Sequence, residues 1–152
     1  METPTSFKVD HLTLEPGIYL RDADHKRGVF TYDIRLVKPT LSQKKALSPQ
    51  ISHTIEHSFA TYLRTISPIR DEVVYIGPMG CLTGFYLLTY INYNKDYIRE
   101  IVIKALEYIR TLEEVPGAKP SECGNYTLFD LPGTKGRIYE FITLLKKDNN
   151  QD

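Results

Sequence analysis

The chain has 152 residues, of which 41% are hydrophobic and 25% are charged, as is ordinary for one globular domain that can bury a core. Lys and Arg number 19, as do Asp and Glu, so no net charge would hold the chain on nucleic acid or on an anionic membrane. No apolar run approaches the ~20 residues of a membrane span, and the N-terminal residues lack the pattern of a signal peptide. We therefore expect a cytoplasmic protein with a single domain over residues 1–152.

The first part of the chain predicts extended segments separated by a turn. Residues 6–14 alternate apolar and polar side chains in part, which predicts an edge strand. Residues 17–21 predict a second strand, and the polar residues 22–28 predict a turn. The clearest strand pattern covers residues 29–37, where apolar and polar residues alternate. Arg35 falls on the polar face of that strand, away from the core.

The middle of the chain predicts one helix and then two strands. Residues 51–66 carry apolar side chains at the spacing of one helical face, and Ser52 is the expected N-cap. Residues 72–76 and 84–91 predict two short strands that are joined by the tight loop G-P-M-G-C-L-T.

The last part of the chain predicts two further helices. Residues 96–114 carry an apolar stripe at helical spacing, and the dipeptide Pro116-Gly117 follows as a stop signal. Residues 131–147 predict a final helix. The whole pattern indicates an α+β fold, in which an antiparallel β-sheet packs against helices on one side.

The segment S-H-T-I-E-H-S contains the strongest chemical signal. His53 and His57 are four residues apart, so on a helix both can point at one ion. Glu56 projects from nearly the same face and can move a proton beside a metal. The order His-x-x-Glu-His is the inverse of a zinc protease motif. Since the only other histidines are His11 and His25, abundance does not explain the cluster, and we interpret it as half of a metal site.

Two histidines leave a catalytic metal site incomplete, because such a site usually has three protein ligands and one open position. The candidates for the third ligand are Cys123, Cys81 and Glu140. One thiolate would complete a His₂Cys site of a known catalytic type. A glutamate ligand would instead indicate a small metallohydrolase in which Glu56 activates water, and two thiolates would indicate a closed, non-catalytic site.

Five stretches, in this order, resemble the S-ribosylhomocysteine lyase (LuxS) family: S-F-K-V-D-H, Y-D-I-R, H-T-I-E-H, G-P-M-G-C-L-T-G-F-Y and C-G-N-Y. The resemblance covers the chain from about residue 6 to residue 145 and implies a LuxS/metallohydrolase-like fold. It implies a carbon–sulfur lyase that converts S-ribosyl-L-homocysteine to L-homocysteine and 4,5-dihydroxy-2,3-pentanedione. In the family the carbonyl migrates twice along the sugar before β-elimination. The product is the precursor of autoinducer-2, which links the reaction to quorum sensing and to the activated methyl cycle.

The resemblance also implies roles for individual residues. His53, His57 and Cys123 match the ligands of one divalent metal per subunit, usually iron(II), with zinc or cobalt able to replace it. Glu56 and Cys81 match the two acid/base residues of the family.

The substrate pocket and the assembly are likewise implied by the resemblance. Ser6, His11 and Arg35 match positions that line the pocket for S-ribosylhomocysteine. The family forms homodimers with active sites at the interface, where the N-terminal segment of one chain approaches the metal site of the other.

The chain departs from the family pattern at several positions. Tyr75 and Gly77 stand where the family often has an acidic residue and a serine. Leu82 follows the cysteine where arginine or glutamine is common, and residues 38–40 read K-P-T where Q-P-N is usual. These departures concern substrate contacts, and they touch neither the expected metal ligands nor the acid/base pair.

Overall fold

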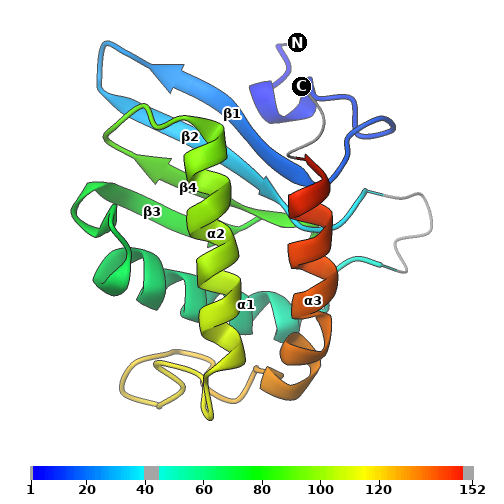
Figure 1. Ribbon diagram of the computed structural model, residues 1–152, viewed down its shortest axis with the longest axis vertical. Coiled ribbons are helices and arrows are strands. Elements are labelled where there is room, and N and C mark those ends of the chain that lie inside the picture. The colour runs from blue at the N-terminus through cyan, green and yellow to red at the C-terminus, as the bar shows by residue number, and fades with distance from the viewer. Residues whose placement is uncertain (1, 40–44, 149–152) are drawn as a thin grey trace.

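The computed structural model describes residues 2–39 and 45–148 (Figure 1). Within these residues, four strands form one antiparallel sheet in the order β1-β2-β4-β3; the strands are β1 (Gly17–Asp24), β2 (Val29–Arg35), β3 (Val73–Pro78) and β4 (Gly84–Thr89). The described residues also form three α-helices, namely α1 (Pro49–Thr61), α2 (Lys95–Arg110) and α3 (Leu131–Asp148). Figure 1 shows α2 and α3 crossing one face of the sheet, while α1 lies along β3. The predicted α+β class is confirmed.

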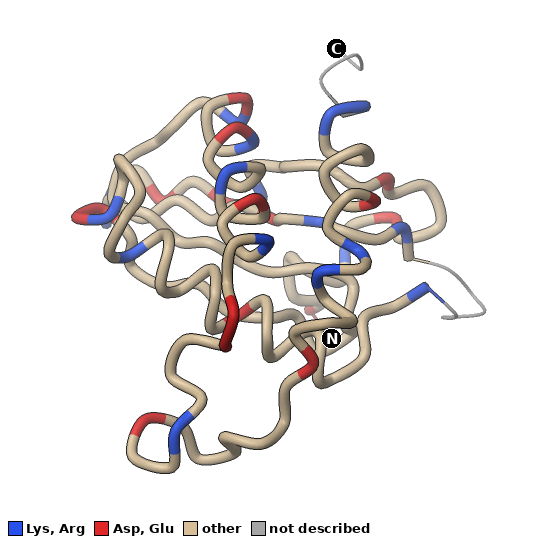
Figure 2. Tube along the Cα trace, turned by 60° about the horizontal axis from the view of Figure 1, so that its bottom comes forward, with Lys and Arg blue, Asp and Glu red and all other residues tan. Residues whose placement is uncertain are grey.

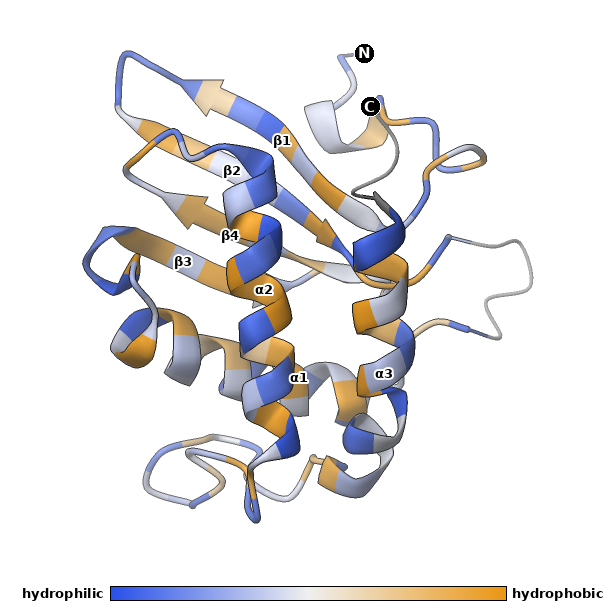
Figure 3. Ribbon diagram, viewed as in Figure 1, coloured by the Kyte–Doolittle hydropathy of each residue, from blue (hydrophilic) through white to orange (hydrophobic). Residues whose placement is uncertain are grey.

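The hydrophobic core lies between the helices and one face of the sheet. Alternate residues of a strand point to opposite faces, so Tyr32 and Ile34 of β2 are fully buried against the helices. Phe85 and Leu87 of β4 are fully buried in the same core. Apolar residues recur along α2 at helical spacing and complete the core from the other side (Figure 3). Among the described residues, no α-helix covers the other face of the sheet.

Helix α1 begins earlier than its apolar pattern predicted. The N-cap is Ser48, whose Oγ accepts a hydrogen bond from the backbone N–H of Ile51 at 3.1 Å. Pro49 then occupies the first turn, where its missing N–H costs nothing and its φ is already helical. Ser52, the predicted N-cap, is therefore a buried residue inside the helix, and that prediction was wrong. Beyond Thr61 the helix continues as a π-helical turn over Tyr62–Ile66.

The N-terminal segment contains no strand, so the edge strand predicted over residues 6–14 was wrong. Thr5–Phe7 form a short 3-10 helix instead. Further on, the Asp10 carboxylate accepts a hydrogen bond from the N–H of Leu12 at 3.0 Å, a local bond that competes with strand pairing. Phe7 and Leu12 are each 72% exposed, so these apolar side chains do not anchor the segment in the core.

Charged residues of both signs are interspersed over the structure (Figure 2). Within the described ranges, none of the helices combines the length and the apolar composition that crossing a lipid bilayer requires.

Candidate metal centre and thiol pocket

His53 and His57 lie on consecutive turns of α1, with ring centroids 4.6 Å apart. The Nδ1 atom of His53 bonds the carbonyl oxygen of Leu128 at 2.7 Å, and that of His57 bonds the carbonyl oxygen of Pro116 at 2.8 Å. A carbonyl only accepts, so each Nδ1 carries a proton, and in the neutral form of each ring Nε2 is the nitrogen with the free lone pair. This is the tautomer that a metal-binding histidine with an oriented ring requires.

Cys123 completes a group of three possible ligands. Its Sγ lies 3.5 Å from His53 Nε2, and the ligand atoms of His53, His57 and Cys123 all lie within 4.8 Å of one another. The backbone N–H of Asn125 donates to the same sulfur at 3.4 Å, as suits a thiolate. Two imidazoles and one thiolate fit a divalent ion with borderline softness. We call these three residues the metal group.

The two other candidates for the third ligand lie outside the metal group. Glu140 forms an ion pair with Arg137 on α3 at 3.2 Å. Cys81 is exposed in the loop between β3 and β4, where its neighbours are different residues. The geometry therefore supports neither the metallohydrolase with a glutamate ligand nor the closed site with two cysteines.

Aromatic packing and one glycine fix the imidazole rings. Phe129 stacks on His53 with centroids 4.1 Å apart and planes 13° apart, and it meets His57 edge-on. Gly117 has φ +74°, and a Cβ at this position would lie 3.0 Å from His57 Nδ1. The sequence identified Gly117 only as a helix stop and gave no signal for Phe129, because neither contact is local in sequence.

Thr54 holds the segment that carries Phe129 against α1. Its hydroxyl donates to the carbonyl of Gln50 at 2.8 Å and accepts from the N–H of Asp130 at 2.9 Å. The Asp130 carboxylate in turn accepts from the N–H of Gly133 at 2.8 Å, in the first turn of α3. The metal group is thus fixed between two helices.

Glu56 lies beside the metal group without belonging to it. Its Oε2 is 3.6 Å from His57 Nε2, and its side chain is 29% exposed. A carboxylate in this position is within reach of a molecule bound next to the histidines and can exchange a proton with it.

Cys81 lies in a separate hollow of about 390 Å³, which we call the thiol pocket. Its lining joins the N-terminal segment to the β3–β4 loop and to the face of the sheet without helices: Ser6, Phe7, His11, Arg35, Pro78, Met79, Gly80, Cys81 and Tyr86. All three expected substrate-binding residues, Ser6, His11 and Arg35, therefore lie together with the expected catalytic thiol.

Arg35 is only 2% exposed, although it lies on the strand face away from the helices, as predicted. Its guanidinium donates to both oxygens of Asp33, at 3.1 and 2.7 Å, and to Oγ1 of Thr83 at 2.8 Å. Arg21 also pairs with Asp33, at 2.8 Å. The Thr83 hydroxyl is 3.1 Å from Cys81 Sγ, and Arg35 Nη1 is 3.9 Å from it. The sulfur is thus bordered by a fixed hydroxyl and a fixed guanidinium.

Tyr86 provides a neutral hydroxyl in the same pocket. Burial raises the pKa of Tyr86 above its ordinary value of 10.0, and the negative charge of Asp33 raises it further. Arg35 and Arg21 oppose this shift, and Cys81 adds to it slightly. At neutral pH the phenol is protonated and can donate a hydrogen bond to a substrate.

The departures at positions 82 and 38 are not part of the thiol pocket. Leu82 has φ +63°, its side chain packs on the hydrophobic core, and its carbonyl accepts from the N–H of Leu47 at 2.8 Å. Lys38 pairs with Glu15 on the surface. Thr40 lies outside the described residues.

The metal group and the thiol pocket share no residue. The loop that carries Cys123 lies at the lower end of Figure 1, whereas the N-terminal segment lies at the upper end. The structure brings the predicted site residues together in two clusters rather than one.

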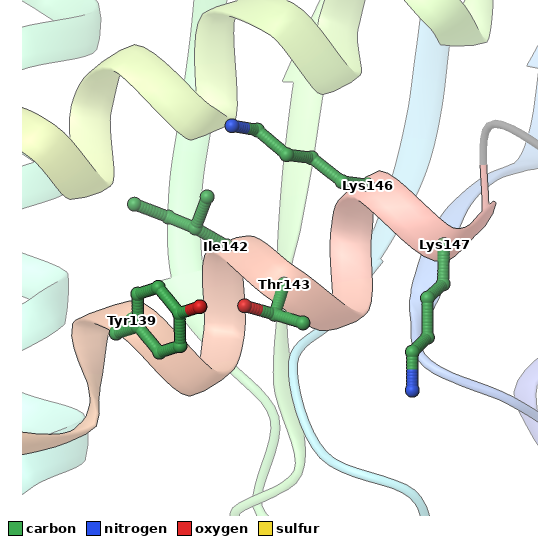
Figure 4. A pocket seen from close by; sticks show the side chains of 5 residues that line it. All are labelled: Tyr139, Ile142, Thr143, Lys146 and Lys147. Atoms are coloured by element: carbon green, nitrogen blue, oxygen red, sulfur yellow. The ribbon is translucent and has the colours of Figure 1, made fainter.

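A further hollow of about 330 Å³ on the outside of α3 contains none of the predicted residues (Figure 4). It is lined by Tyr139, Ile142, Thr143, Lys146 and Lys147, and the two lysines point in different directions. Without a histidine, cysteine or carboxylate in its lining, it offers no comparable chemistry.

Together, the α+β fold, a His-His-Cys group that could hold a metal ion, the carboxylate beside it and a thiol in a pocket are the features of a small enzyme with a candidate metal site. The sequence model of the S-ribosylhomocysteinase (LuxS) family matches residues 5–152. An S-ribosylhomocysteine lyase of Phocaeicola vulgatus is 42% identical, with 98% of this chain and 96% of the relative covered. A lyase of Porphyromonas gingivalis is 43% identical, and the match covers 93% of this chain and 90% of the relative. A lyase of Clostridium acetobutylicum is 40% identical, and the match covers 87% of this chain and 84% of the relative. The chain belongs to the LuxS family, as its motifs indicated.

Proposed function

We propose that the protein is an S-ribosylhomocysteine lyase, which cleaves the thioether of S-ribosyl-L-homocysteine to L-homocysteine and 4,5-dihydroxy-2,3-pentanedione. The observation that carries this proposal is the metal group with Glu56 beside it, in a chain that belongs to the LuxS family over almost its whole length. In the cytoplasm this reaction would return homocysteine to the methyl cycle and supply the precursor of autoinducer-2.

The ligands we propose for one divalent metal ion are His53, His57 and Cys123. Two observations support this fit. The Nδ1 atom of each histidine donates a hydrogen bond to a backbone carbonyl, so both Nε2 atoms and the Cys123 sulfur are available to bind the ion. Iron(II) is the proposed ion, and zinc or cobalt can replace it, because imidazole and thiolate ligands suit all three. When bound, the ion supplies a Lewis acid for the oxygens of the sugar. Elemental analysis of protein purified without air tests its identity.

Glu56 and Cys81 are the proposed acid/base residues. Each carbonyl migration removes a proton from a carbon beside a carbonyl and returns one to the neighbouring carbon, so the substrate is oxidised at one carbon and reduced at the other. The Glu56 carboxylate can carry these protons beside the metal group, and the Cys81 thiol can do so from the other side of the sugar. In the final β-elimination a proton leaves the carbon next to the carbonyl, the carbon–sulfur bond breaks, and the sulfur leaves with the electron pair and takes up a proton.

A homodimer would unite the two clusters. Within the described residues, the sheet face that carries the thiol pocket is covered by no α-helix, only in part by the N-terminal segment, and a second copy could pack on the rest of it. Because Cys81 lies with Ser6 and His11 in one chain, a partner that presents its N-terminal segment to the metal group would bring its thiol too. Each active site would then use Glu56 of one chain and Cys81 of the other.

The direct test is to incubate protein loaded with iron(II) without air with S-ribosylhomocysteine and to measure the release of free thiol. We expect one thiol per substrate consumed, with the diketone product trapped by an aromatic diamine. A metal-loaded, folded protein that releases no thiol would overturn the proposal. A hydrolase that cleaved peptides instead would restore the metallohydrolase interpretation.

A further inference from the structure

Tyr75 and Gly77 occupy adjacent same-face positions on β3, which is an edge strand of the sheet. In the strand register Tyr75 lies opposite Leu88, and Gly77 lies opposite Tyr86. Tyr86 is itself opposite Asp33, which shares its face of β2 with Arg35. Both positions therefore belong to the sheet face that carries the thiol pocket.

The Tyr75 side chain lies across Gly77. A Cβ at position 77 would be 2.6 Å from Cε2 of Tyr75 and would overlap its Cζ and hydroxyl oxygen as well. Gly77 is not among the described residues with positive φ, so the backbone does not require glycine there. The space does: the phenol occupies the volume that any side chain at position 77 would take.

This placement puts a hydroxyl beside the β3 side of the thiol pocket, although neither Tyr75 nor Gly77 lines the pocket itself. Pro78, the residue after Gly77, lines the pocket, and so does Tyr86 opposite it. Tyr75 is 53% exposed, and its hydroxyl has no hydrogen-bond partner within residues 2–39 and 45–148. A phenol is neutral at physiological pH and both donates and accepts, so it suits the uncharged hydroxyls of a sugar better than it suits an ammonium or carboxylate group.

We infer that Tyr75, whose ring lies over Gly77 at the edge of the thiol pocket, is a specificity-determining residue whose hydroxyl hydrogen-bonds a hydroxyl of the pentose part of the substrate. The inference rests on the proposed function. It gives one account of the two departures at positions 75 and 77: the aromatic residue and the glycine form a unit, because the ring can lie there only while position 77 lacks a side chain.

Tyr75→Phe removes the hydroxyl and keeps the ring. For homocysteine release we expect KM to rise about three- to tenfold while kcat changes less than about twofold, since one hydrogen bond to bound substrate is lost. Tyr139→Phe on α3, where the side chain is 79% exposed, is the matched control and should leave both constants unchanged. An unchanged KM in Tyr75→Phe, or a loss confined to kcat, would overturn the inference.

A second set of variants tests whether Tyr75 and Gly77 depend on each other. Gly77→Ser displaces the ring and should raise KM at least as much as Tyr75→Phe does. Tyr75→Asp together with Gly77→Ser installs the pair common in the family, and it should restore KM towards the wild-type value. If the rise in KM of the double variant equalled the combined rises of the two single substitutions, the two positions would be independent. That result would contradict the coupling, because residues in contact should not act independently.

The outcomes distinguish this inference from the proposed function. A wild-type protein that releases no homocysteine overturns the proposed function. An active wild type with an equally active Tyr75→Phe variant overturns only the role of Tyr75. Sedimentation of each variant shows whether it changes the association of two copies. A KM change that follows dimer dissociation would make Tyr75 an interface residue and would reject the sugar contact.

Discussion

The metal group and the thiol pocket are built in opposite ways. The metal group joins α1 to the segment between α2 and α3, and backbone carbonyls hold its rings, while Phe129 packs on both. The thiol pocket rests on side chains of neighbouring strands, chiefly the Arg35–Asp33–Thr83 network, and the N-terminal segment that borders it leaves Phe7 exposed. Ligands must be oriented before an ion binds, whereas a thiol that acts on substrate must remain accessible.

The largest expected difference between the two clusters is in metal retention. Cys123→Ala should lose both the metal and the activity, since two histidines remain as ligands. Cys81→Ala should keep the metal and lose about 10²–10⁴-fold in turnover, as expected for removal of an acid/base group. Elemental analysis and thiol release on protein purified without air measure the two effects. Full turnover by Cys81→Ala would remove Cys81 from the proposed mechanism.

Mixing two inactive variants tests whether the clusters meet across a dimer. If Glu56 and Cys81 of one active site come from different chains, a mixed dimer of Glu56→Gln and Cys81→Ala contains one intact site and one doubly altered site. After equal mixing and subunit exchange, about a quarter of the wild-type activity should return, because about half of the dimers are mixed. The unmixed variants are the controls. No recovery despite proven exchange would indicate that one chain supplies both residues.

Gly117→Ala should weaken the metal group selectively. The new Cβ would crowd His57 Nδ1, where the ring bonds the Pro116 carbonyl, so we expect metal affinity to fall about 10–100-fold. The positive φ should also reduce the free energy of unfolding by roughly 1–2 kcal/mol.

Gly28→Ala is the matched control for this variant, since Gly28 has φ +71° and a Cβ added there would meet no atom within 4 Å. It should lose a similar amount of stability and keep full metal affinity. Equal metal affinity in the two alanine variants, measured by competition with a chelator, would show that the ring of His57 does not depend on Gly117.

The smallest expected effect concerns stability at high pH. Burial raises the pKa of Tyr32 in the core, and that of Tyr86 in the thiol pocket, above 10.0. Unfolded tyrosines therefore release their protons at lower pH than these two, so stability is fully present below pH ~10 and falls as pH rises through the folded-state pKa. Urea unfolding between pH 8 and pH 11 measures the decline. Tyr32→Phe and Tyr86→Phe should each reduce the loss of stability between pH 8 and pH 11, whereas Tyr139→Phe should leave it unchanged.

Local pattern predicted most of the elements, and it failed where local signals competed. Alternation predicted β2 and the burial of Tyr32 and Ile34, because the period of a strand fixes which side chains share a face. The same alternation over residues 6–14 predicted a strand that does not form, since a strand also needs a partner and Asp10 bonds locally instead. Ser52 fits an N-cap by residue type, but Pro49 starts the helix earlier.

The sequence by itself determined the α+β class, the His-x-x-Glu-His face of α1 and the family to which the chain belongs, because each depends on spacing along one element or on motifs in order. Reasoning from the residues alone left Cys123, Cys81 and Glu140 open as the third ligand, and the family resemblance pointed to Cys123; the tertiary structure is what brings Cys123 to the two histidines and Cys81 to Ser6 and His11. It also decided that the ring of Tyr75 fills the space at Gly77. Cys123 is seventy residues from His53, farther along the chain than Cys81, and yet it is the cysteine that meets the histidines, because the loops and the packing bring it there.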